Sequence, residues 1–314
     1  MTKVDWLYKT CIACLKPFEE TGNRRRSDAH VIPESLGGKL SLTCLCAGCN
    51  NLIGTRYEDK LPLVETYANE MERFADIVPF FAKQLRKPGR TYVAQSEHGP
   101  LKMKRDRSDG AFRVVDTELE SGRFKDSRDA GRELRQRLRR NKASPAEIET
   151  LLARFEQGEA VQVDDRIFVP HSGELQPLFA SGVYLGPDEA YLGIAYLWLA
   201  CNAGRGIYAE KLNGVRGVLV GDESDRDGSW QVERFQTTRD GRPRESEPWH
   251  RLVMSQKTPI AIDVTVFGRW LYRVTFATVG WPGPRGGYRL NLETGEEEVV
   301  ALRDADAAVP DAQP

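Results

Sequence analysis

The chain has 314 residues, of which 40% are hydrophobic and 29% charged, and its formal net charge is −1. This composition is typical of a globular protein with a sizeable core, arranged as one large domain or two of ordinary size. No run of about 18 apolar residues occurs, which excludes a membrane-spanning helix. The start, MTKVDWLYKTC, lacks the apolar segment of a secretion signal, so we expect a cytoplasmic protein.

Charge is distributed unevenly along the chain. Residues 1–140 hold 27 Lys and Arg against 20 Asp and Glu, whereas residues 141–314 hold 18 against 26. The overall net charge argues against a nucleic-acid partner, but a basic first part suits a protein whose N-terminal region meets phosphates. Uneven charge alone is a weak indication, because charge also fluctuates between the halves of proteins that bind no nucleic acid.

Five of the six cysteines lie between residues 11 and 49, and four of them form two C-x2-C pairs separated by 31 residues. Each pair can present two thiolates from a tight turn. Cys11, Cys14, Cys46 and Cys49 therefore predict a structural Zn²⁺ site with four sulfur ligands and no open coordination position. Such clustering in a reducing compartment indicates a metal rather than disulfides. A segment of some 50 residues can hardly bury a sufficient hydrophobic core, so the zinc would stabilise its fold instead.

Helices and strands are predicted beyond the second cysteine pair. Apolar residues recur at every third or fourth position from Leu61 to about Arg86, which predicts an amphipathic helix with a kink or break at Pro79. TYVAQ (91–95) and AFRVVDTEL (111–119) predict strands around a charged turn.

Two further helices are predicted next. SRDAGRELRQRLRRNK (127–142) is a candidate basic helix. SPAEIETLLARFEQG (144–158) has a Ser cap, a Pro in the first turn, a Glu three residues past the cap and a closing Gly, all typical of a helix.

The last part of the chain mixes strands with one strongly apolar helix, GPDEAYLGIAYLWLACNAG (186–204). VQVDDRIFV (161–169) and WHRLVMSQ (249–256) predict single strands, and residues 260–279 predict a pair of strands that turns at Phe267-Gly268. Cys44, beside Leu45, and Cys201, in the apolar helix, are interpreted as packed side chains rather than ligands. The acidic end of the chain is predicted to be a disordered tail.

A second motif lies between the cysteine pairs and just after them: AHVIPESLGGK (29–39), then CAGCNNLIG (46–54). It resembles the HNH endonucleases, in which a strand ends in a catalytic His, followed by apolar residues, a Pro and often Gly-Gly. In that family a His or Asn follows the second cysteine pair at the start of a helix. The resemblance is clear over residues 9–62 and fainter over HRLVMSQ and IDVTVFGRWLYRVTF, which look like the C-terminal half of some longer HNH proteins. It implies a ββα-metal fold braced by the zinc.

The resemblance also implies a chemistry, the metal-dependent hydrolysis of DNA phosphodiester bonds. His30 would be the general base that takes a proton from water. Asn50 would supply an oxygen ligand to a divalent cation, Mg²⁺ or Mn²⁺, at the scissile phosphate. Many longer HNH proteins of this kind serve in bacterial genome or phage defence, and that role is implied by the resemblance alone.

The sequence departs from the family pattern at two places, Ala29 and Ser41. The residue before the catalytic His usually binds the metal, but here it is Ala29; Asp28 could substitute if the strand has a local adjustment such as a bulge. The Asn that usually steadies the catalytic ring aligns with Ser41, whose hydroxyl could still form a hydrogen bond. Either Glu58 or Asp59 could be the missing carboxylate, because both lie about one helical turn past Gly54.

Basic residues near this motif are candidates for binding DNA. Arg24, Arg25 and Arg26 lie just before the strand that ends at His30, and Lys39 follows the paired glycines. Such cations would position double-stranded DNA without reading bases, so binding should weaken with salt. The basic helix at 127–142 is a weaker candidate, because its charges could merely cover an exposed face.

Together these features predict an α+β protein with a zinc-braced HNH module at residues 1–62, a mixed α+β region at 63–300 and a disordered acidic tail at 301–314. The mixed region would serve target selection, regulation or dimer contacts. A single unit cuts one strand per visit, so double-strand breaks would require a homodimer. Two alternatives stay open: a zinc-stapled DNA-binding module that has lost catalysis, and a protein–protein adaptor on a zinc scaffold.

Overall fold

The computed structural model divides the chain into two compact units. The first contains residues 1–62, 67–87 and 185–314, and the second contains residues 63–66 and 88–184. The described residues are 2–87, 90–96, 99–105, 112–114, 118–120, 123–124, 127–163, 166–168, 186–221, 228–236, 238–239, 242–243, 245–277, 279–280 and 285–302. This division differs from the expected separation of residues 1–62 from residues 63–300. Residues 1–62 instead share a unit with the C-terminal part of the chain, because the apolar helix packs on residues 41–46, and Thr2 and Lys39 donate hydrogen bonds to Glu297 and Gly295.

The N-terminal module, residues 1–62, has the expected succession of two strands and a helix. β2 (Arg26–His30) pairs antiparallel with β3 (Ser41–Cys46), and α1 (Ala47–Arg56) follows β3 directly. β1 (Lys3–Val4) adds a short parallel strand on the other side of β3. The module is thus a ββα unit at the start of an α+β protein, in agreement with the predicted fold class.

The paired glycines after His30 are required by the backbone of the loop between β2 and β3. Gly37 ends the 3₁₀-helix Glu34–Leu36 with φ of +89°, a left-handed conformation that favours glycine. A Cβ on Gly38 would lie 1.8 Å from the carbonyl oxygen of Ile32, so no larger residue fits there. The loop can therefore fold back on itself only with glycine at position 38, and it favours glycine at position 37.

The amphipathic segment after the module is not one helix. It forms the 3₁₀-helix Glu58–Leu63, α2 (Glu65–Arg73) and α3 (Pro79–Leu85). The predicted break at Pro79 is confirmed, because Pro79 occupies the first turn of α3, where its missing amide hydrogen costs no hydrogen bond.

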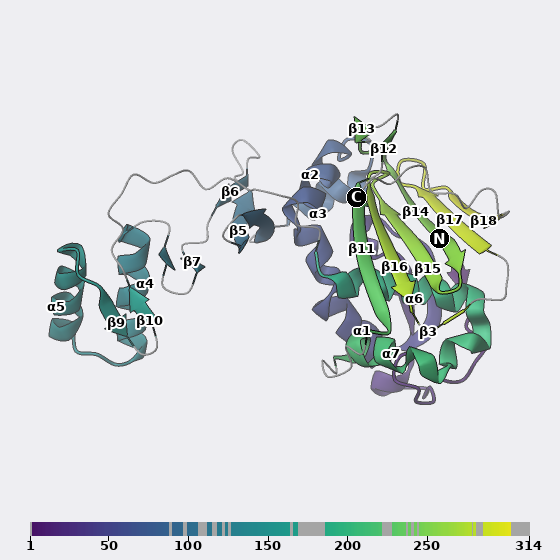
Figure 1. Ribbon diagram of the computed structural model, residues 1–314, viewed down its shortest axis with the longest axis horizontal. Helices are drawn as coiled ribbons and strands as arrows, with labels where there is room; N and C mark the ends of the chain where they lie inside the picture. Colours follow the sequence, from purple (N-terminus) through teal and green to yellow (C-terminus); the bar gives the residue numbers. More distant parts are fainter. Residues whose placement is uncertain are drawn as a thin grey trace. The chain divides into compact units, whose positions relative to one another are not determined.

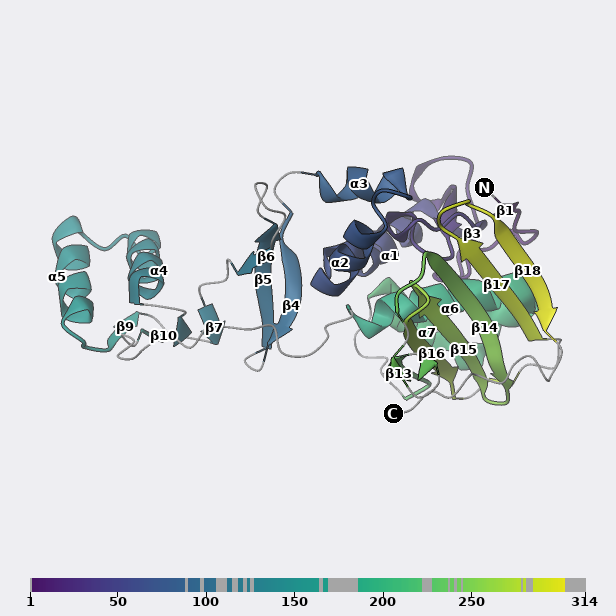
Figure 2. The ribbon, with the colours of Figure 1, turned by 90° about the horizontal axis from the view of Figure 1, so that it is seen from above.

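A six-stranded antiparallel sheet forms the C-terminal part of the first unit, in the order β11-β16-β15-β14-β17-β18. Figures 1 and 2 show α6 lying along one face of this sheet. All seven residues of β15 are buried, as are eleven consecutive residues of α6, from Ala190 to Ala200. The predicted apolar helix is thus the central element of the core. The bounds are α6 (Asp188–Ala203), α7 (Asn213–Val220), β11 (Trp230–Gln236), β12 (Thr238–Arg239), β13 (Arg242–Pro243), β14 (Trp249–Lys257), β15 (Ile260–Val266), β16 (Trp270–Phe276), β17 (Arg285–Asn291) and β18 (Glu297–Leu302).

Two expectations for this part of the chain had different outcomes. The turn at Phe267-Gly268 between paired strands is confirmed, and both residues have positive φ. The disordered tail is wrong for residues 301 and 302, which belong to β18 and pair with β17. The pairing continues along the whole of β18, from Glu297 opposite Leu290 to Leu302 opposite Arg285, and Glu297 also accepts hydrogen bonds from the Tyr288 hydroxyl and from Thr2. Residues 303–314 lie outside the described residues.

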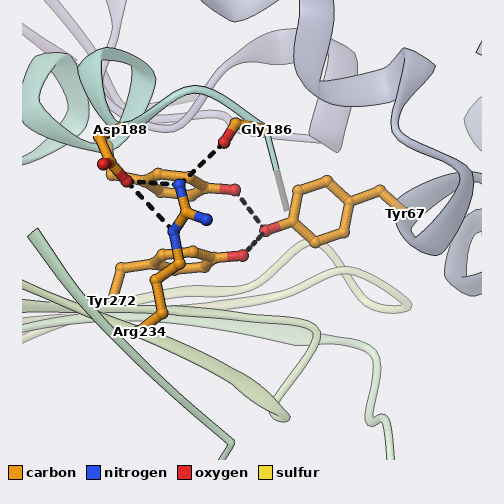
Figure 3. Close-up of polar contacts among 6 residues, drawn as sticks. Tyr67, Gly186, Asp188, Arg234 and Tyr272 are labelled. Carbon is orange, nitrogen blue, oxygen red and sulfur yellow. Dashed lines mark hydrogen bonds and ion pairs between the residues drawn. The ribbon is translucent and has the colours of Figure 1, made fainter. Parts of the chain in front are cut away.

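Three buried tyrosine hydroxyls meet between α2, α6 and the sheet. The Tyr67 hydroxyl forms hydrogen bonds with those of Tyr191, at 2.5 Å, and Tyr272. The rings of Tyr191 and Tyr272 stack with 3.5 Å between their centroids. Nearby, the guanidinium of Arg234 donates to Asp188 at the start of α6 (Figure 3). Side chains from four elements therefore satisfy one another inside the core, which fixes α2 and α6 against the sheet.

A buried histidine ties the loop after β2 to the sheet. His250 of β14 is 0% exposed; its Nε2 donates to the carbonyl of Leu36 at 2.9 Å, and its Nδ1 accepts from the amide of Phe267 at 3.1 Å. Because one ring nitrogen donates and the other accepts, the ring is neutral. Burial lowers the pKa of His250 to about 4.

The second unit contains a three-stranded sheet, two short strand pairs and two helices. β4 (Tyr92–Ser96), β5 (Gly99–Arg105) and β6 (Phe112–Val114) form one antiparallel sheet, and β7 (Glu118–Glu120) pairs with β8 (Arg123–Phe124). The predicted helices are confirmed as α4 (Ser127–Arg140) and α5 (Pro145–Glu156), and the Ser144 hydroxyl caps α5 by accepting from the amide of Glu147. The segment expected as one strand is a hairpin of β9 (Val161–Val163) and β10 (Arg166–Phe168). None of the helices in the described ranges is long and apolar enough to cross a membrane.

We expect Tyr67→Phe to lower the free energy of unfolding by about 1–3 kcal/mol, because it leaves the buried hydroxyls of Tyr191 and Tyr272 one partner short. Urea unfolding followed by circular dichroism measures the change. Tyr8→Phe is the matched control, since the Tyr8 hydroxyl forms no hydrogen bond with any described residue. Equal losses in the two variants would contradict the interpretation.

The lowered pKa of His250 predicts a pH dependence of stability. The folded-state pKa lies below the ordinary value of 6.5, so the contribution is complete above pH 6.5 and is lost as the pH falls towards 4. We expect the loss to reach about 3 kcal/mol across this window. His250→Gln cannot titrate and should flatten this part of the profile, as measured by urea unfolding at four pH values from 4 to 7. Parallel profiles for the two proteins would exclude His250 as the cause.

Candidate metal and nuclease site

The four cysteines of the two pairs come together as predicted. One sulfur atom from each of Cys11, Cys14, Cys46 and Cys49 lies within 4.8 Å of all the others. Cys11 and Cys14 come from the turn before β2, whereas Cys46 ends β3 and Cys49 lies in the first turn of α1. Four clustered thiols with no oxygen or nitrogen donor form a set that could bind zinc.

Hydrogen bonds within the cluster lower the pKa of one of the four thiols, that of Cys11. The Cys11 thiol accepts a hydrogen bond from the backbone amide of Cys46 at 3.4 Å. Together with the hydrogen bond from Cys49, which is the largest contribution, such interactions lower the pKa of Cys11 to about 5. The same hydrogen bond raises the pKa of Cys49, so without a metal the cluster holds its negative charge on the Cys11 sulfur. Cys44 is fully buried and lies outside the four-cysteine group, as expected of a packed side chain.

Two tyrosines hold the first cysteine turn against the rest of the unit. The Tyr196 hydroxyl of α6 donates to the carbonyl of Ile12 at 2.8 Å, and the Tyr208 hydroxyl donates to the carbonyl of Thr10 at 2.6 Å. The backbone amide of Ile12 in turn donates to the carbonyl of Cys44. The turn is therefore fixed from both sides, by α6 and by β3.

His30 and Asn50 belong to adjoining elements of the module. His30 is the last residue of β2 and is half-buried, while Asn50 lies in the first turn of α1. The Asn50 side-chain amide donates to the backbone carbonyl of Asp28 at 3.1 Å and to the Ser27 hydroxyl at 3.0 Å. These bonds hold the start of α1 against the strand that ends at His30. They use only the amide nitrogen, and the Asn50 Oδ1 accepts no hydrogen bond from the described residues.

The strand pairing is irregular at the place where an aspartate could replace the usual metal ligand. Ser27 pairs with Leu45 and Ala29 pairs with Leu42, so two residues of β3 lie opposite Asp28. This is the pattern of a β-bulge on β3. Ala29 is 1% exposed and faces the core, whereas the Asp28 side chain is half-exposed.

Asp28 has a partner that no sequence pattern indicates. The ammonium group of Lys3 lies 2.8 Å from its carboxylate. Both side chains are about half-exposed, so the ion pair is screened by water and is weak. Lys3 reaches Asp28 only through the pairing of β1 with β3, which the sequence does not predict.

Ser41 does not make the hydrogen bond that was considered for it. It pairs with His30 across the two strands and is 0% exposed, but its hydroxyl has no hydrogen-bond partner among the described residues. The position opposite His30 is therefore occupied by a small side chain that does not orient the ring.

Glu58 and Asp59 begin the 3₁₀-helix after α1. Burial of the carboxyl, with a smaller effect of the Asp59 charge, raises the pKa of Glu58 to about 7. Asp59 is exposed. Across the described residues, the four cysteines are the only group of three or more His, Cys, Asp and Glu side chains close enough to share an ion. The candidate acids thus do not form a preassembled cage.

Most of the basic candidates are engaged within the protein. The guanidinium of Arg26 donates to the carbonyls of Trp6 and Tyr8, both at 2.6 Å, and lies over the ring of Phe18. Arg24 forms an ion pair with Glu19. Two further candidates have weaker ties: Arg25 donates to the carbonyl of Gly22 at 3.4 Å, and Lys39 donates to the carbonyl of Gly295 at 3.0 Å. Their role in binding nucleic acid stays a prediction.

Comparison with known proteins agrees with this geometry. Residues 11–62 match the sequence model of the HNH endonuclease family. The N-terminal module is an HNH module. The match covers both cysteine pairs, β2, β3 and α1, and it supports a nuclease-type function that uses divalent metals and acts on nucleic acid. No curated protein and no solved structure matched the chain.

We expect Cys49→Ser to reduce bound zinc from one ion per chain to almost none, because it removes one of the four sulfur ligands. Zinc released on denaturation can be measured with a colorimetric chelator, and the melting temperature should fall at the same time. Cys201→Ser is the control, since Cys201 lies outside the cluster. Full zinc content in Cys49→Ser would rule out the four-sulfur site.

Proposed function

We propose that the protein is a metal-dependent endonuclease that hydrolyses phosphodiester bonds of double-stranded DNA, one strand at a time. His30 is the general base, and Asn50 with an acid from Asp28, Glu58 or Asp59 holds the catalytic divalent ion. Zn²⁺ in the four-cysteine site has a structural role. A part in defence against phage or other invading DNA stays a prediction from the family resemblance.

One observation carries this proposal, the pair of hydrogen bonds from Asn50 to the strand that ends at His30. They join the helix and strand that bear the two candidate groups, inside the segment that matches the HNH family. A lone histidine or a lone asparagine beside a zinc site would be an ordinary structural residue. Their connection through Ser27 and the Asp28 carbonyl supports a shared site.

The residues of the module can divide the reaction between them. The imidazole of His30, at the end of β2, accepts a proton from the attacking water. Asn50 keeps its Oδ1 available while its amide nitrogen holds β2, so positioning and ligation use different atoms of one side chain.

The oxygen donors suit Mg²⁺ or Mn²⁺ better than a transition metal that prefers sulfur or nitrogen. Mg²⁺ is usually held by one or two carboxylates together with water and substrate phosphate, so a preassembled cage is not required. A bound divalent ion would offset the charge that develops on the scissile phosphate and the leaving oxygen. Asp28 is the nearest acid in sequence to His30. To bind the ion, its carboxylate would have to give up its ion pair with Lys3.

A second candidate function is a DNA-binding module without catalysis. Three observations favour it. Ala29 stands where the family has a metal ligand, and the Ser41 hydroxyl has no hydrogen-bond partner among the described residues. The carboxylate of Asp28 is already paired with the ammonium group of Lys3. Such a protein would keep its fold, zinc and DNA affinity but would not cut.

We expect His30→Ala to lower the rate of plasmid nicking by about 10²–10⁴-fold in Mg²⁺ or Mn²⁺, because the attacking water loses its general base. The measurement is the conversion of supercoiled to open-circular plasmid. Glu34→Gln is the control, since Glu34 is an exposed acid on the loop after His30 and should leave the rate unchanged. Zinc content should be equal in all three proteins.

The outcomes separate the candidate functions. DNA binding with no nicking by the wild type would indicate the degenerate module, and no DNA binding at all would favour the adaptor. Equal nicking by the wild type and His30→Ala would remove His30 from its role.

A further inference from the structure

A concave basic surface lies on α3, outside the segment that matches the HNH family. An open hollow of about 580 Å³ is lined by Ala75, Asp76, Pro79, Ala82, Lys83, Arg86 and Lys87. Lys83, Arg86 and Lys87 are exposed, and Asp76 is the single acid in the lining. We call this set of seven residues the α3 hollow. Because its lining has three cations and one acid, the α3 hollow favours the binding of an anion.

The cations of the α3 hollow differ from the arginines before β2 in their interactions. Arg24 is paired with Glu19, and Arg26 donates to two backbone carbonyls. The side chains of Lys83, Arg86 and Lys87 form no ion pair or hydrogen bond with any described residue. Their charges are therefore not offset within the part of the protein that the structure describes.

The α3 hollow belongs to the same compact unit as the HNH module. The ring of Phe81, in the middle of α3, lies against Gly37: a Cβ on Gly37 would be 3.6 Å from it. Gly37 belongs to the loop that follows His30. The helix that carries Lys83 is thus packed against the loop that follows the strand of the proposed general base.

We propose that the α3 hollow binds backbone phosphates of the DNA on which the HNH module acts. This inference rests on the proposed function and adds an interaction that positions the substrate. Phosphates of DNA are spaced closely along each strand, so a row of cations can meet consecutive charges. Asp76 would limit binding by repelling phosphate from its end of the hollow, which leaves the C-terminal end of α3 as the binding surface.

Another physical explanation of these cations predicts a different result. Positive side chains near a helix C-terminus interact favourably with the helix dipole, with or without DNA. Removing them would then lower the melting temperature and leave DNA binding unchanged.

The test compares two triple variants of the full-length protein that remove the same charge. One is Lys83→Gln/Arg86→Gln/Lys87→Gln in the α3 hollow. The matched control is Arg205→Gln/Lys211→Gln/Arg289→Gln, which neutralises three exposed cations of the same compact unit that are not candidates for binding DNA. Affinity for a fluorescein-labelled duplex of about 30 base pairs is measured by anisotropy at several salt concentrations, with Ca²⁺ in place of Mg²⁺ to limit cleavage.

We expect the α3 variant to bind about tenfold more weakly at low salt, and the slope of log affinity against log salt to fall by about 0.9 for each phosphate that the variant no longer neutralises. The control should keep the wild-type slope. Wild-type affinity and slope in the α3 variant would overturn the inference, as would an equal weakening in the control, which would indicate an effect of net charge alone. The proposed function fails separately, if the wild type binds the duplex but does not nick plasmid in Mg²⁺ or Mn²⁺.

Discussion

The meeting of four sulfur atoms at one point is the constraint on which the HNH module depends. It joins two turns that are 31 residues apart in the chain, and so fixes where β3 ends and where α1 begins. Backbone hydrogen bonds run between the same turns, from Ile12 to Cys44 and from Cys46 to the Cys11 sulfur. The segment between them, with β2 and its terminal histidine, is held at both ends. A zinc ion at that point would set the relation between His30 and Asn50 without contributing to the reaction itself.

The module is also built into a larger core. Tyr196 and Tyr208 hold the first cysteine turn, and His250 holds the loop after β2. At the far edge of the sheet, Glu297 accepts a hydrogen bond from the Thr2 hydroxyl. The candidate nuclease residues therefore depend on packing against α6 and the six-stranded sheet as well as on the metal. A rigid support of this kind suits a site whose groups must be held close to one geometry.

Local sequence rules predict the elements whose causes are local. Cysteine spacing predicts the four-sulfur cluster, Pro79 a helix start, and Ser144 a cap, because each acts within one turn of chain. The need for a bulge near Asp28 follows from the alternation of side chains along a strand. The family resemblance supplies the ββα succession around these features.

Features that depend on distant partners are not predictable in the same way. Lys3 reaches Asp28 through strand pairing, and Arg26 is bound by carbonyls of residues some 20 positions earlier. The hairpin at residues 161–168 resembles one strand in the sequence, because its two short arms share the same apolar alternation. β18 resembles a disordered tail, because its acidic residues give no sign of the hydrogen bonds that hold Glu297. The division into units depends on packing between segments that are distant in the chain.

The interrupted layout of the first unit has a consequence for how the protein is made. The N-terminal module, residues 1–62, is synthesised before residues 88–184 of the second unit, and the apolar helix and strands that pack with the module follow afterwards. Until then Tyr67 has neither of its hydroxyl partners, and the loop at Leu36 lacks its histidine donor. A chain that ends before the apolar helix and the six-stranded sheet would thus carry the HNH motif without the packing that supports it.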